Sequence, residues 1–174
     1  MSKTPDQVSE YVRAAVDFVQ RAVGMVLDGS DESLAVLDHY VAQVPRDQPE
    51  IVGLVTPAVG AYFGEVVRRR FGGEWRLDGE PTAWRLSLEG GAVTFAPVGM
   101  AAAAVYRAEV EGFDAEMTLA PAHREDIEAG LELAAPVTEE YYYSLTGRFE
   151  TIQHVLDLLA GLRARARRAD DEQN

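Results

Sequence analysis

Residues 61–75, AYFGEVVRRRFGGEW, contain the change of periodicity that decides the fold. Before Gly72 the apolar residues recur at helical spacing, and after Gly73 they alternate as in a β-strand. A glycine pair between two such patterns is typical of a helix end that turns into a strand. This stretch therefore predicts a helix that leads directly into a sheet.

The alternation continues beyond Gly73 in three short runs. These runs are residues 74–77, 84–88 and 93–95. Turn residues separate them, Asp78-Gly79-Glu80-Pro81 and Gly90-Gly91, so we expect an antiparallel meander with one face packed on helices. Residues 113–119 alternate again and indicate a fourth strand.

Most of the remaining chain is predicted to be helical. Thr4 and Pro5 are expected to begin the first helix, with Gly29 as its stop. Pro57 lies inside the third helical pattern, where it either kinks the helix or splits it. Further helices are expected over 31–44, 97–106, 122–133, a segment capped by Thr138, and 149–166.

The prediction is one α+β domain over residues 1–168, a three- to four-stranded antiparallel sheet packed against a majority of α-helices, followed by a frayed acidic tail over 169–174.

Composition narrows the class of protein. The chain has 174 residues, 47% of them hydrophobic, which predicts one globular domain, and the absence of cysteine excludes disulfides and thiol chemistry. A net charge of −13 opposes binding to nucleic acid or to an anionic membrane.

The N-terminus has no signal-peptide pattern, and no apolar run approaches membrane-spanning length, so we expect a cytoplasmic protein. All basic residues except Lys3 are arginine, a bias that suggests a bacterial source.

Glu65 is the candidate polar position inside the fold. At helical spacing it falls beside the apolar face that contains Tyr62, and it precedes Arg68 and Arg69 by three and four residues. One interpretation is a structural glutamate paired with arginine. The other is a ligand-binding cleft between this helix and the sheet, formed by Tyr62, Glu65 and Arg69, with a perturbed carboxylate pKa.

Acidic residues concentrate between residues 109 and 140, where ten carboxylates face a single arginine, Arg124. This distribution predicts either a solvated surface or a docking surface for a basic protein. The residues proposed for partner binding are Glu125, Asp126, Glu128, Glu132, Glu139 and Glu140. Tyr141, Tyr142 and Tyr143 follow, and at least one of them is expected to be exposed because consecutive helical residues cannot share one face.

Signatures of catalysis and metal binding are missing from the sequence. His39, His123 and His154 fall in separate predicted segments, so we expect no metal, and no cofactor motif is present. No nucleophile elbow occurs, so the sequence predicts no catalytic residue. Trp75 and Trp84 are expected to pack in the core.

Short motifs between about residues 55 and 105 resemble uncharacterised bacterial domain-of-unknown-function families. The motifs are Gly64-Glu65 late in a helix, Gly73-x-Trp75 at a strand entry, and Phe95-x-Pro97 at a strand exit. The resemblance implies a bacterial α+β domain and attaches no activity.

Three hypotheses follow from the sequence. The first is a non-enzymatic protein-interaction module, either an immunity-type protein or a regulatory adaptor, that uses its acidic C-terminal half. The second is a small-ligand-binding protein or enzyme with a cleft at Glu65. The third, compatible with both, is a homodimer, because Phe18 and Met25 extend the apolar surface of the first helix beyond its main stripe.

Overall fold

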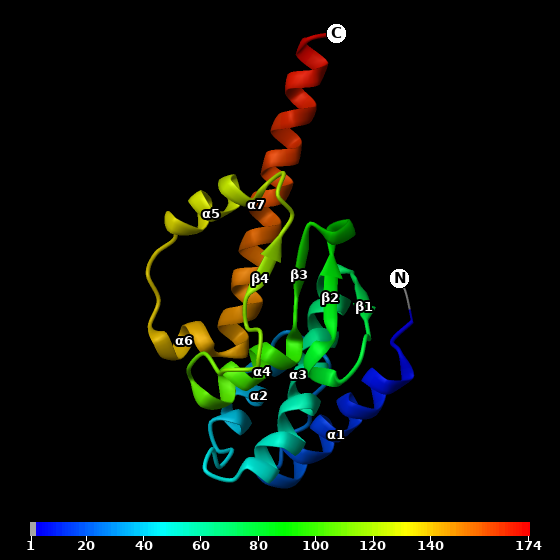
Figure 1. Ribbon diagram of the computed structural model, residues 1–174, viewed down its shortest axis with the longest axis vertical. Helices are drawn as coiled ribbons and strands as arrows, with labels where there is room; N and C mark the ends of the chain where they lie inside the picture. The colour runs from blue at the N-terminus through cyan, green and yellow to red at the C-terminus, as the bar shows by residue number, and fades with distance from the viewer. Residues whose placement is uncertain (1–2) are drawn as a thin grey trace.

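The computed structural model describes residues 3–174 as seven α-helices and a four-stranded antiparallel sheet (Figure 1). The helices are α1 (Asp6–Val23), α2 (Ser33–Val41), α3 (Pro49–Phe71), α4 (Pro97–Tyr106), α5 (Arg124–Glu132), α6 (Glu139–Tyr143) and α7 (Leu145–Glu172). The strands are β1 (Glu74–Arg76), β2 (Arg85–Leu88), β3 (Val93–Phe95) and β4 (Met117–Leu119). The predicted α+β class is therefore confirmed.

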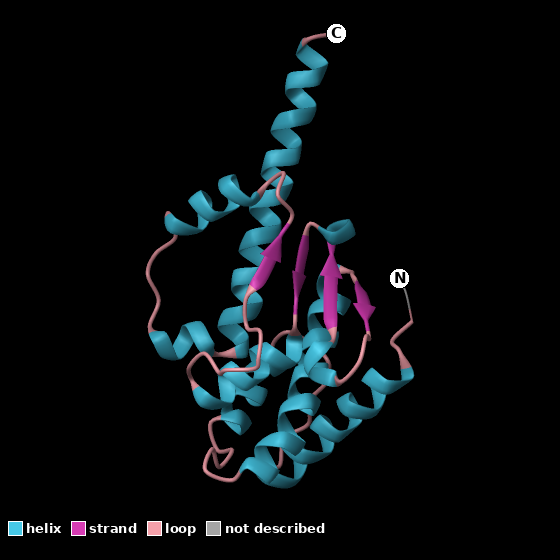
Figure 2. Cartoon of the chain, viewed as in Figure 1, coloured by secondary structure: helices cyan, strands magenta, loops and turns pink. Residues whose placement is uncertain are grey.

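The strands follow one another in chain order across the sheet, and each pairs antiparallel with the next. One row of paired residues runs across all four strands, from Trp75 through Leu86 and Phe95 to Met117. Figure 2 shows that helix predominates over this small sheet, as the sequence predicted. The fourth strand is shorter than the predicted 113–119, and before it the backbone of Asp114 lies against Gly99 of α4.

α3 forms the centre of the core and passes very close to α4. A Cβ added at Gly60 would lie 2.6 Å from the Cα of Val98, and one at Gly64 would lie 2.3 Å from the ring of Trp75. Neither distance is compatible with a side chain, so glycine is required at both positions. α3 continues without a break through Pro57, which resolves the alternative between one helix and two in favour of one.

α3 is also long and apolar enough to cross a membrane by length and composition, a property that the sequence analysis did not anticipate. However, 72% of its most apolar window is buried inside the protein. This burial is consistent with the core helix of a soluble protein.

Several helix ends differ from the sequence prediction. α1 begins at Asp6 and is preceded by Pro5, so Thr4 is not its cap. It ends at Val23, where the following Gly24 has φ +70°, so Gly29 is not its stop. Thr138 does cap α6 by accepting a hydrogen bond from the Tyr141 amide, as predicted. α7 begins at Leu145, earlier than the predicted 149, and continues to Glu172, so residues 169–172 are helical. The C-terminal part of α7 projects beyond the sheet (Figure 1).

Candidate functional site

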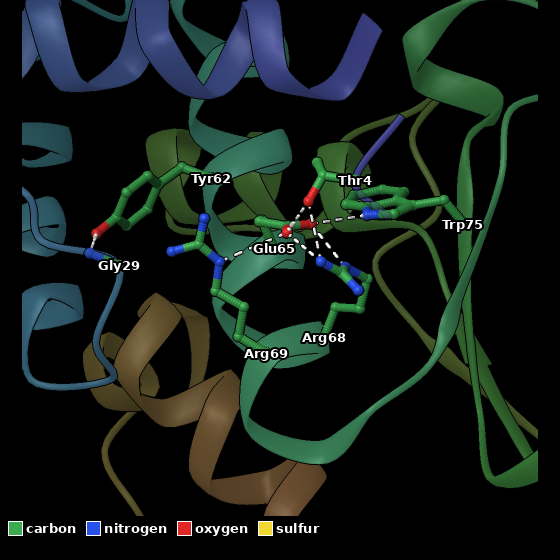
Figure 3. A network of polar contacts seen from close by, with 7 residues as sticks. All are labelled: Thr4, Gly29, Tyr62, Glu65, Arg68, Arg69 and Trp75. Atoms are coloured by element: carbon green, nitrogen blue, oxygen red, sulfur yellow. Dashed lines mark hydrogen bonds and ion pairs between the residues drawn. The ribbon is translucent and has the colours of Figure 1, made fainter. Parts of the chain in front are cut away.

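The Glu65 carboxylate lies at the centre of a polar network that joins three parts of the chain (Figure 3). Arg68 donates to it twice, from Nε at 2.9 Å and from an Nη at 2.6 Å. Trp75 donates from Nε1 at 3.1 Å, and the Thr4 hydroxyl donates to the same carboxylate. Arg69 adds an ion pair at 3.5 Å. The network therefore ties the N-terminal segment and β1 to α3.

The side chain of Glu65 is almost completely buried, with 3% of its surface exposed. Burial raises the pKa of the carboxyl, but hydrogen bonds from Arg68, Thr4 and Trp75 together outweigh burial and hold the pKa below its usual value. The group is therefore ionised and fully partnered at neutral pH. Such a carboxylate stabilises the fold and has no free lone pair directed at solvent.

Tyr62 and Arg69 lie on the same side of α3 as Glu65. The Tyr62 hydroxyl accepts a hydrogen bond from the Gly29 amide at 2.8 Å and lies 2.6 Å from the Ser33 hydroxyl. The cavity that these residues line has a volume of about 10 Å³, which is the space of about one water molecule. The hypothesis that Tyr62, Glu65 and Arg69 bind a small ligand therefore receives no support from the geometry.

The six acidic residues proposed for partner binding lie on α5 and at the start of α6, and all are exposed. We call these six residues, Glu125, Asp126, Glu128, Glu132, Glu139 and Glu140, the acidic face. Among residues 3–174, none of them forms an ion pair. Within that range, Arg124 forms no ion pair with them, and its guanidinium donates to the Leu119 carbonyl at 3.0 Å.

The segment between α5 and α6 carries apolar side chains into solvent. Leu133 is 89% exposed and Val137 is 55% exposed, and every residue from 132 to 140 is exposed. The segment arches away from α7 (Figure 1). Apolar side chains bordered by unpaired charges are typical of a protein-binding surface.

The remaining candidates occupy structural positions. Trp84 is buried, as predicted, while Trp75 is half-buried and uses its indole N–H on Glu65. His39 lies in α2, His123 immediately precedes α5, and His154 lies in α7. Within residues 3–174, no group of three or more histidine or acidic side chains is placed to hold a metal ion.

Sequence reasoning did not single out two residues with unusual environments. Asp38 in α2 caps the N-terminus of α7 through the backbone amides of Leu145 and Thr146. Arg148 in α7 is buried without a hydrogen bond at Nε. An aspartate on an apolar helix and an arginine in a helical run carry no sequence signal for these roles, since both depend on packing between distant elements.

Comparisons with models of known protein families, with curated proteins and with solved structures found no match. The class that the fold defines is a helix-rich α+β domain. No family model supports the resemblance drawn from the short motifs. Their residues lie late in α3 (Glu65), in β1 (Trp75), and at the junction of β3 and α4 (Phe95 and Pro97).

Proposed function

We propose that the protein is a non-enzymatic interaction module that binds a basic protein through the acidic face. The immunity-type role and the regulatory-adaptor role both use this chemistry. The observation that supports the proposal is the combination of six exposed, unpaired carboxylates with exposed Leu133 between them.

Charge and apolar contact would contribute differently to such a complex. The acidic face would attract a basic partner from a distance and raise the association rate, an effect that salt screens. Leu133 and Val137 would be buried on contact and would slow dissociation. A cytoplasmic location fits a partner of this kind.

The test is affinity capture from a lysate of the organism that encodes the chain, followed by a salt titration of the purified complex. One variant neutralises part of the acidic face with E125Q, D126N, E128Q and E132Q. A matched control neutralises four exposed acids elsewhere, with E80Q, D170N, D171N and E172Q. We expect the first variant to lose at least about tenfold in affinity and the control to retain wild-type affinity.

Two results would overturn the proposal. One is a captured partner whose affinity is the same for the wild type and the acidic-face variant. The other is equal loss in both variants, which would mean that net charge alone, rather than this surface, drives binding.

A further inference from the structure

Arg148 is a buried cation that has no hydrogen-bond acceptor and no ion-pair partner among the described residues. Only 6% of its surface is exposed, and its Nε has no hydrogen bond. Among residues 3–174, no carboxylate lies within ion-pair distance of the guanidinium and no acceptor is bound by any of its N–H groups. Buried polar groups are almost always satisfied, so the N–H groups of Arg148 are available to an acceptor from outside the chain, either water or a ligand.

Two tyrosines of α6 hold the guanidinium in place. Its Cζ lies 4.5 Å from the ring centre of Tyr142 and 5.6 Å from that of Tyr143. The two rings pack edge to face, with their centres 5.0 Å apart. Stacking fixes the plane of the guanidinium without using its N–H groups, which leaves them free to bind an anion.

Arg148 and Tyr142 line a cavity of about 420 Å³, within the range of small-molecule sites. The segment 109–116 also lines the cavity, and its lining residues include Phe113 and the acidic residues Glu109, Glu111 and Glu116.

The 109–116 wall is anchored to the body of the protein. A Cβ at Gly99 of α4 would lie 1.7 Å from the Asp114 carbonyl oxygen, so glycine allows this backbone to contact the helix directly. Asp114 also forms an ion pair with Arg85 at 3.5 Å and accepts a hydrogen bond from the Glu116 amide at 3.0 Å. Among the described ion pairs, none includes Glu109, Glu111 or Glu116.

We propose that this cavity binds the carboxylate end of a basic amino acid, either the free amino acid or the C-terminal residue of a peptide. The carboxylate would take the bidentate position on Arg148, the geometry that guanidinium groups favour. The cationic side chain would lie toward Glu109, Glu111 and Glu116, and its methylenes would contact Phe113 and Tyr142. The site uses no residue of the acidic face and does not depend on the function proposed above.

The charge pattern of the cavity selects this class of ligand. A phosphate or another dianion would be repelled by the carboxylates of the wall, which outnumber the single arginine. A purely cationic ligand would leave Arg148 buried and unpaired. A ligand that carries both charges can pair its carboxylate with Arg148 and its cation with the acidic residues of the segment 109–116.

The experiment is isothermal titration calorimetry of the full chain with matched probes. L-arginine is compared with agmatine, which lacks the carboxylate, and with L-citrulline, which replaces the guanidinium by a neutral urea. The peptide Gly-Gly-Arg is compared with its C-terminal amide. We expect L-arginine or Gly-Gly-Arg to bind at about millimolar concentration or more tightly. Agmatine, citrulline and the amide should each bind at least about tenfold more weakly.

Two variants assign the contacts. R148K retains the charge but loses the bidentate geometry, and should weaken L-arginine binding about tenfold or more. The surface variant E109Q/E111Q/E116Q, which leaves Arg148 untouched, should weaken L-arginine while leaving L-citrulline unchanged. Binding of only one of the two probes would support the proposal and identify the source as free amino acid or peptide terminus.

The proposal is overturned if neither L-arginine nor Gly-Gly-Arg produces a binding isotherm at about 10 mM. It is also overturned if agmatine binds as tightly as L-arginine, since the carboxylate would then have no role. These comparisons use the wild-type protein, so they stand even if R148K fails to fold.

Discussion

Asp38 in α2 accepts hydrogen bonds from both the backbone N–H and the hydroxyl of Thr146 in α7, at 3.0 and 2.6 Å. It also accepts from the Leu145 amide at 2.7 Å. One carboxylate thus satisfies two of the free amides at the start of α7 and places a negative charge at the positive end of that helix. The cap comes from a residue more than a hundred positions away, so it fixes α7 against α2.

Replacing Asp38 by alanine is expected to destabilise the protein by about 1–3 kcal/mol, because the two amides lose their cap and Thr146 loses its partner. Urea denaturation followed by circular dichroism measures the change. D157N, at an exposed position of the same helix α7, is the control and should be neutral. Equal stability of D38A and wild type would contradict this role.

Glu65 should make stability depend on pH. Its folded pKa lies below the ordinary value of 4.5, so its contribution is present above that value and lost as pH falls through the folded pKa. E65Q is expected to cost about 3 kcal/mol at pH 7, because Arg68 remains buried without its ion pair. The same variant should lose less stability than wild type between pH 7 and pH 3.

Asp38 should change the dependence of stability on pH in the direction opposite to Glu65. Burial raises the pKa of the Asp38 carboxyl above 3.8, against the hydrogen bonds from Thr146 and Leu145. The pH-dependent part of its contribution is therefore most favourable below 3.8 and decreases as pH rises through the folded pKa, although the ionised carboxylate still caps α7. Comparing the pH profiles of E65Q and D38N with wild type separates the two groups. Parallel profiles for all three proteins would contradict both assignments.

The buried hydroxyl of Thr56 is expected to lower the stability of the protein. It is 2% exposed, and its hydroxyl has no hydrogen bond among the described residues. T56V removes the unsatisfied hydroxyl and should stabilise the protein by about 1 kcal/mol, measured as a higher urea midpoint at unchanged m-value. A destabilised T56V would mean that the hydroxyl has an acceptor in solution.

Gly60 and Gly53 make a matched pair within α3. G60A should destabilise the protein by about 2 kcal/mol or more, because its Cβ would meet the backbone of Val98 at 2.6 Å. G53A, at an exposed position with no atom within 4 Å of the new Cβ, should stabilise it by about 0.5–1 kcal/mol. Differential scanning calorimetry should show melting temperatures that move in opposite directions. Stabilisation by both would refute the close approach of α3 and α4.

Periodicity determined the elements of this protein because it is a local property of the chain. The switch at Gly72-Gly73 located the junction of α3 and β1, and the alternating runs located β1 to β3 in their pairing order. The helix ends were less predictable, as Thr4 shows. It has the chemistry of an N-cap, yet its hydroxyl donates to Glu65, because a contact with a residue 61 positions away competes with the local one.

The polar environments were decided by tertiary structure alone. The sequence predicted that Glu65 lies near the apolar face and precedes two arginines, but not that Thr4 and Trp75 complete its shell. It contained no sign that Asp38 caps α7 or that Arg148 is buried without a hydrogen-bond acceptor among the described residues. Burial and hydrogen bonding arise where elements far apart in the chain meet, so residue spacing cannot specify them. What the sequence determined was the order and type of the elements, and what packing decided was which of their polar groups are satisfied within the chain and which remain free to bind.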